Sequence, residues 1–107
     1  MSLLSIPGEL KIQKTEKRFE TIIEDHAAFI DYLERGEDPI KMYLTHTEVA
    51  PELGGRGLAA KLVLQVLTWI KDQGYILYPY CPYIAKYIRR HPEWKAIVAK
   101  NFPLEKY

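Results

Sequence analysis

Three glycines lie close together in the segment from Val49 to Ala59, between a predicted strand and a predicted helix; the segment reads Val-Ala-Pro-Glu-Leu-Gly-Gly-Arg-Gly-Leu-Ala. The first backbone N–H groups of a helix lack partners within it and carry a partial positive charge. Glycines let the backbone approach an anion without interference from a Cβ atom. The segment therefore predicts a phosphate-binding turn, although glycines before a helix can also serve only the shape of the turn. Its spacing matches neither the P-loop nor the dinucleotide fingerprint.

Cys81 is the only cysteine, and it stands between a predicted strand and Pro82. Because proline favours the first position of a helix, Cys81 is expected at or beside an N-cap. A thiol at a helix start is more readily deprotonated and more nucleophilic than an ordinary one. The alternative is that a lone cysteine acts as a small buried hydrophobic residue. The residues by themselves leave both interpretations open.

Two more residues near the glycine turn carry chemistry. Glu48 ends a predicted strand beside the turn, where it could accept a proton from an amine or simply be a solvated strand end. His46 falls on the same face of the predicted strand as Met42 and Leu44, which predicts a buried, hydrogen-bonded histidine rather than a catalytic one. The histidines, at positions 26, 46 and 91, show no metal-ligand spacing with one another or with the cysteine, so no metal is expected.

Hydrophobic periodicity supplies the elements that must position these residues. Residues 10–14 and 40–49 alternate apolar and polar side chains, as half-buried strands do. An apolar stripe at helical spacing follows the glycine turn and ends before Gly74, a good C-cap. The predicted strands are residues 10–14, 19–23, 40–49 and 75–80, and the predicted helices are residues 57–72 and 82–90.

The segment from Asp25 to Glu37 is ambiguous from its pattern alone. As a helix it would have Asp25 as its cap and Gly36 at its end, with three apolar residues, Phe29, Ile30 and Leu33, at helical spacing. As a strand it would place Phe29 and Leu33 on one side, with Ile30 and Tyr32 on the other.

The motif Val49-x-Pro51-x-Leu53-x-Gly55-x-Gly57-Leu58-Ala59-x-x-Leu62 resembles the acetyl-CoA motif of the GNAT superfamily of N-acetyltransferases. The family pattern is Gln or Arg, two residues, Gly, one residue, then Gly or Ala. Gly57 and Ala59 match its last two places, whereas Gly54 departs from the first. The flanking segments 46–49 and 81–94 are similar to a subgroup of very small GNAT domains that have a cysteine at this place.

The resemblance implies an α/β (α+β) fold of the minimal GNAT type. Such a fold has a mostly antiparallel curved sheet, one main helix and a short C-terminal helix. Strands 40–49 and 75–80 would be parallel but splayed, leaving a slot for the pantetheine arm, and the ambiguous segment would be a strand. Residues 1–8 are expected to be a loose N-terminal extension of a single domain at residues 9–107.

The resemblance also implies a reaction, the transfer of an acetyl group from acetyl-CoA to an amine. The acceptor would be a small molecule or a protein lysine. The catalytic candidates are Cys81, Glu48 and Tyr87, the last because similar helices present a tyrosine that can protonate the departing thiolate. The expected cofactor-binding residues are Val49, Gly54, Gly55, Arg56, Gly57, Leu58, Ala59 and Lys86. A catalytically silent CoA-binding or protein-interaction module is the alternative.

Charge and composition limit the partners and the cellular compartment that we expect for this protein. The 107 residues have a net charge of +1, which gives no overall attraction to nucleic acid or to an anionic membrane. The basic run from Lys86 to Lys100 is either a solvated surface or a contact for the phosphates of CoA. The acidic run from Glu20 to Asp38 is either solvated or a face for a cationic substrate. A single cysteine and no signal peptide predict a cytoplasmic protein.

Overall fold

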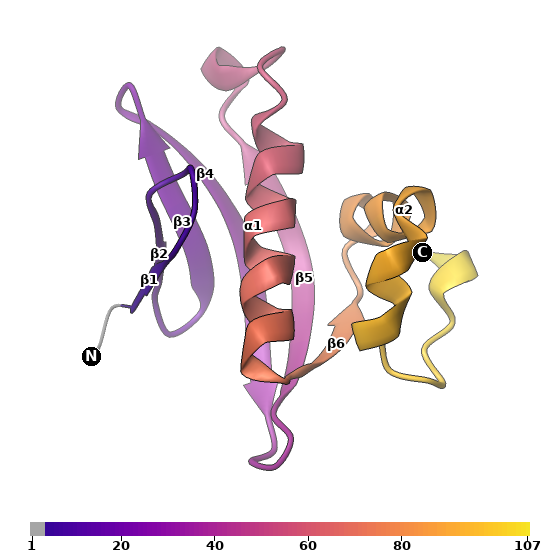
Figure 1. Cartoon of the computed structure of the whole chain (residues 1–107). Helices are drawn as coiled ribbons and strands as arrows, with labels where there is room; N and C mark the ends of the chain where they lie inside the picture. Colours follow the sequence, from indigo (N-terminus) through magenta and orange to yellow (C-terminus); the bar gives the residue numbers. More distant parts are fainter. Residues whose placement is uncertain (1–3) are drawn as a thin grey trace.

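Alternating side chains build one six-stranded sheet in the computed structural model, which describes residues 4–107 (Figure 1). The strands are β1 (Leu4–Ile6), β2 (Ile12–Lys14), β3 (Arg18–Ile23), β4 (His26–Arg35), β5 (Lys41–Val49) and β6 (Ile76–Pro79). They lie in sequence order across the sheet, and every neighbouring pair is antiparallel except β5 and β6, which are parallel. This is the architecture that the sequence and its resemblance predict.

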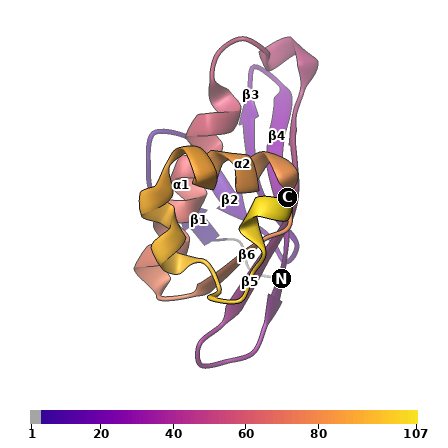
Figure 2. The same ribbon diagram turned by 90° about the vertical axis from the view of Figure 1, so that its right-hand side faces the viewer.

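The main helix, α1 (Leu58–Gln73), covers one face of the sheet (Figure 1). Most of its predicted apolar stripe is buried, and Gly74 caps its end with φ 75°. The second helix, α2 (Pro82–Arg90), follows β6 and lies at the β6 edge with the C-terminal segment (Figure 2). Three short 3₁₀ turns complete the chain: η1 (Pro51–Leu53), η2 (Pro92–Ile97) and η3 (Leu104–Lys106). Within residues 4–107, no helix has both the length and the apolar character that crossing a membrane requires.

The ambiguous segment is a strand, β4, as the resemblance implies. Ile30 and Tyr32 are buried under α1, while Phe29 and Leu33 point to the opposite face of the sheet. A tight turn at Glu24 and Asp25, with φ values of 52° and 67°, leads into β4 from β3. The alternation of side chains, rather than the spacing of three apolar residues, determines the local structure here.

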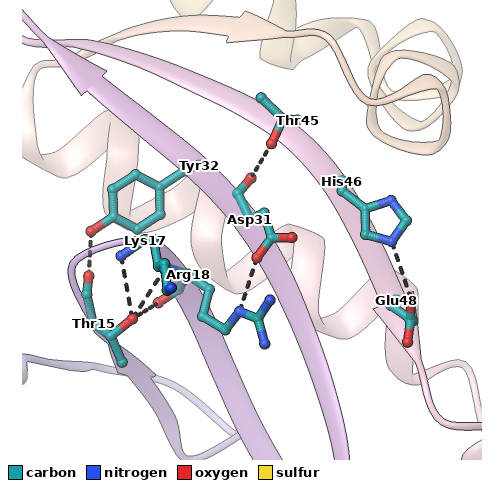
Figure 3. A network of polar contacts seen from close by, with 8 residues as sticks. All are labelled: Thr15, Lys17, Arg18, Asp31, Tyr32, Thr45, His46 and Glu48. Carbon is teal, nitrogen blue, oxygen red and sulfur yellow. Dashed lines mark hydrogen bonds and ion pairs between the residues drawn. The ribbon is translucent and has the colours of Figure 1, made fainter.

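A β-bulge in β5 overturns the prediction for His46. Asp31 pairs with His46 and Tyr32 pairs with Leu44, so Thr45 is an extra residue in β5. The hydroxyl of Thr45 donates a hydrogen bond of 3.3 Å to the Asp31 carbonyl oxygen (Figure 3). An extra residue reverses the alternation of all that follow it. His46 therefore lies on the open face, with its side chain 56 % exposed, instead of in the core.

The predicted N-terminal extension is corrected in part, because residues 4–6 form β1 and pair with β2. Residues 1–3 lie outside the described part of the chain. The buried amide of Gln65 on α1 holds the connection between the two strands. Its Oε1 accepts a hydrogen bond from the Leu10 N–H, and its Nε2 donates to the carbonyls of Ile6 and Leu10, all at 2.8–3.0 Å. A side chain of α1 thus ties the first hairpin to the helix layer.

Replacing Gln65 with leucine is expected to lower the free energy of unfolding by about 2–4 kcal/mol. The substitution leaves buried backbone groups of the first hairpin without partners, at about 1–3 kcal/mol each. Urea denaturation monitored by circular dichroism measures the loss. Lys61→Ala is the matched control on the same helix. It removes only an exposed ion pair with Glu9 and should cost less than about 1 kcal/mol. Equal losses in the two variants would contradict the role of Gln65.

Candidate active site

The place where β5 and β6 part is the predicted position of the slot. The two strands are paired from Lys41 and Ile76 to Leu44 and Pro79, and β6 then ends. The Cys81 N–H makes a final hydrogen bond of 2.9 Å to the Leu44 carbonyl oxygen. β5 continues to Val49, paired only with β4, while the chain after β6 turns into α2 (Figure 1). The bulge at Thr45 lies at the level where the strands separate, so the predicted parallel, splayed pair is present.

Cys81 is the N-cap residue of α2, as its position before Pro82 predicts. Its side chain is buried, and its Sγ lies 3.3 Å from the hydroxyl oxygen of Thr47 on β5. The N–H groups of Tyr83 and Ile84 donate no hydrogen bond within the described chain. The thiol therefore lies beside the positive end of a helix, at the point where the two strands separate. Its burial is equally compatible with a packing role.

The glycine turn leaves a run of backbone donors free. No N–H group of residues 55–60 donates a hydrogen bond to any other residue in 4–107. Gly55 and Gly57 have φ values of 79° and 69°, and a Cβ added to either would meet nothing within 4 Å. Glycine is needed here for the backbone conformation, and the space above the turn is open. Consecutive free N–H groups at the start of α1 are what an anionic phosphate group requires.

Gly54 differs from the other two glycines. Its φ is −63°, and its N–H is used in a 3.0 Å bond to the Pro51 carbonyl. A Cβ at this position would lie 3.2 Å from the Pro51 oxygen. The tight η1 turn therefore explains why a small residue stands where the family pattern has Gln or Arg. The donors of the turn begin at Gly55.

Arg56 in the turn is held by an acid from the β3–β4 hairpin. Its Nη2 lies 2.8 Å from Glu24 Oε1, and both side chains are exposed. The hydrogen bond and charge of Arg56 lower the pKa of Glu24. This pair uses one of the three guanidinium nitrogens, so the side chain can contact a phosphate through the others.

A hollow of about 230 Å³ lies between the first turn of α1 and α2. It brings together two predicted residues, Lys86 and Tyr87. Four others line it that the sequence analysis did not single out: Ala60, Tyr83, Arg90 and His91. Residues 83, 86, 87 and 90 have the spacing of one helix face, and this spacing could have identified the lining of the hollow from the sequence. A larger hollow, about 610 Å³, lies among residues 95–106 and contains neither the glycine turn nor Cys81.

Burial, the nearby charge of Glu93 and the interaction with Tyr83 raise the pKa of Tyr87 above its ordinary value, so the phenol stays protonated at neutral pH. Its ring packs 4.4 Å from the His91 ring and faces the hollow. Within residues 4–107 it makes no hydrogen bond to Cys81. Six positions along a helix place the two residues on different faces. Tyr87 therefore lines the hollow and does not contact the Cys81 thiol through a hydrogen bond.

Glu48 lies on the open face of the sheet, where it pairs across from Phe29 on β4. Its carboxylate accepts a hydrogen bond of 3.2 Å from His46 Nε2 (Figure 3). Thr47, the residue before it, points the other way and contacts Cys81. The bulge therefore brings Thr47 to the thiol and leaves Glu48 on the opposite side of β5.

A comparison with protein-family models matches residues 18–97 to a family described as GCN5-related N-acetyl-transferase. The match includes the slot, the glycine turn, Cys81 and the hollow beside α2. The comparison with curated proteins gives no match. Because the match extends over most of the chain and the fold has the expected splayed strands, the protein belongs to the GCN5-related N-acetyltransferase family.

Proposed function

We propose that this protein transfers an acetyl group from acetyl-CoA to an amine, either a small molecule or a protein lysine. The observation that carries the proposal is the run of free N–H groups at residues 55–60 beside the slot. The family match supports the acetyl-CoA assignment over other phosphorylated ligands. Acetyl-CoA would supply the acetyl group as an activated thioester.

The residues present fit this cofactor. The N–H groups of residues 55–59 would hold the pyrophosphate, with Leu58 buried beneath them to fix the start of α1. Lys86 and Arg90, on the hollow between the helices, offer positive charge to the remaining phosphate. Val49 and Gly54 would shape the ends of the turn, and Ala59 keeps its first helical turn small. Arg56 would contribute through the guanidinium nitrogens that do not contact Glu24.

Three side chains are the candidates for chemistry in this proposal. Cys81 would contact the acetyl group, either assisting its transfer or carrying it. The protonated hydroxyl of Tyr87 would donate a proton to the departing thiolate. Glu48 would accept a proton from the amine, approaching from the open face of the sheet. Cys81 and Glu48 would thus act from opposite faces of β5.

A catalytically silent CoA-binding module is the second candidate function. It is favoured by the separation of Glu48 and Tyr87 from the thiol, since each has its contacts elsewhere. A silent module would bind CoA but acetylate no member of an amine panel. Steady-state assays with acetyl-CoA distinguish the two functions.

Calorimetric titration of the protein with CoA tests the shared part of both functions. Saturable binding with one site per chain is expected. Heat changes no larger than those of dilution, at millimolar CoA, would refute the assignment of the glycine turn as a cofactor site.

The charge of the hollow gives a further prediction. CoA affinity should fall as the salt concentration rises from about 0.05 to 0.5 M, because exposed charges are screened beyond roughly one Debye length. Lys86→Gln should weaken binding at low salt and make it less salt-dependent. Lys100→Gln is the matched control, because Lys100 is basic but lies outside this hollow. Affinity that does not respond to salt would show that Lys86 belongs to a solvated surface.

A further inference from the structure

We propose that Thr47 is a positioning residue for Cys81: its hydroxyl donates a hydrogen bond to Sγ, which orients the sulfur in the slot and favours the thiolate. The inference rests on the proposed function, which gives Cys81 its place beside the acetyl group. No sequence pattern pointed to Thr47, because its partner lies 34 residues away.

Backbone pairing fixes the positions of both Thr47 and Cys81. The backbone of Thr47 is paired with that of Ile30, a fully buried residue of β4. The backbone of Cys81 is tied to Leu44 on β5 by its 2.9 Å hydrogen bond. A threonine side chain has few rotamers because it is branched at Cβ. The 3.3 Å approach of Oγ1 to Sγ is therefore a product of the sheet and not of a mobile loop.

The bulge at Thr45 creates the contact. Without the extra residue, His46 would share the face of Leu44, and Thr47 would point to the open side. With it, Thr47 faces the slot at the level where β6 has already ended. The bulge that exposes His46 therefore also places the Thr47 hydroxyl against the Cys81 thiol.

The direction of the hydrogen bond depends on whether the sulfur is protonated. The hydroxyl can accept from a neutral thiol or donate to a thiolate. Hydrogen bonds to a charged partner are roughly twice as strong as neutral ones, so the contact favours the ionised sulfur. The free N–H groups of Tyr83 and Ile84 act in the same direction.

Charged side chains near the pair are directed elsewhere. On β5, His46 and Glu48 are paired with each other on the open face. On α2, Lys86 lines the hollow with Tyr87. The side-chain hydrogen-bond partner of Sγ in the described chain is the hydroxyl of Thr47.

The test compares Thr47→Val with Thr47→Ser in the protein without CoA. The thiolate fraction at neutral pH is read from ultraviolet thiolate absorbance, with Cys81→Ala as the blank. Thr47→Val should lower this fraction about tenfold, since valine keeps the shape and removes the donor. Thr47→Ser should retain it. Thr68→Val is the matched control, because the exposed Thr68 hydroxyl on α1 bonds to the Leu64 carbonyl oxygen and not to sulfur.

The pH dependence of alkylation by iodoacetamide gives a second readout. In that reaction the thiolate sulfur bonds to the reagent's methylene carbon and iodide leaves. The rate should follow the same order of variants. An unchanged thiolate fraction in Thr47→Val, or an equal loss in Thr47→Ser, would overturn the proposal. These measurements contain no CoA, so they do not depend on the acetyltransferase assignment. If that assignment is wrong, calorimetry will show no CoA binding, while the thiolate fraction will still fall in Thr47→Val.

Discussion

Gly57→Glu is expected to abolish detectable CoA binding, with a loss of affinity of at least about 100-fold. Placing a like charge against a bound anion costs several kcal/mol, and each 1.4 kcal/mol is about tenfold. The new carboxylate would stand over the free N–H groups that begin α1, in space that is open at present. Its backbone, at φ 69°, would also be strained by about 1–2 kcal/mol. Calorimetry with CoA measures the loss, and circular dichroism checks that the fold survives.

Gly74→Glu provides a matched control at the other end of the same helix. Gly74 has a similar φ of 75°, and its Cβ would also enter open space. The two variants therefore share the strain and the added charge, but only Gly57 borders the turn. Gly74→Glu should lose comparable stability and keep wild-type affinity. Wild-type binding by Gly57→Glu, or equal loss in both variants, would place the phosphate elsewhere.

Cys81→Ala is expected to lower kcat by at least about 100-fold, within the range for loss of a side chain that acts in the chemical step. Wild-type protein incubated with acetyl-CoA should acquire one acetyl group, detected by mass spectrometry, and the variant should acquire none. Because the chain has a single cysteine, alkylation by iodoacetamide reports on this thiol alone. Bound CoA should slow that alkylation, since the thiol lies where the two strands separate.

The pattern of results separates three roles for this thiol. Loss of both label and turnover supports a carrier. Loss of the label with turnover intact means that the amine attacks directly and that acetylated Cys81 is a side product. Alkylation unaffected by CoA would place the thiol outside the active site, and the silent-module function would then be favoured.

Much of this fold could be predicted from local patterns. Alternation identified β5, and helical periodicity with Gly74 identified α1. Pro82 correctly placed Cys81 at a helix start. The β4 segment was decided by resemblance, because three apolar residues fit a helix and a strand equally well. These successes share a cause: each depends on residues within a few positions of one another.

The candidate site depended more strongly on tertiary structure. The glycine turn was predictable because its conformation is local, as the positive φ values of Gly55 and Gly57 show. The pairing of Arg56 with Glu24 was not, because it joins residues 32 positions apart. Nor was the small hollow, whose lining comes from both α1 and α2.

What the sequence by itself determined, then, is the order of the elements, the glycine turn and the position of Cys81. Only the tertiary structure decided which side chains of β5 face the slot. One extra residue at Thr45 reverses the alternation, so His46 became exposed and Thr47 came to lie against Cys81. A bulge forms where two strands pair with unequal residue counts, and that depends on β4 as much as on β5. The bulge therefore cannot be predicted from the residue pattern of β5 alone.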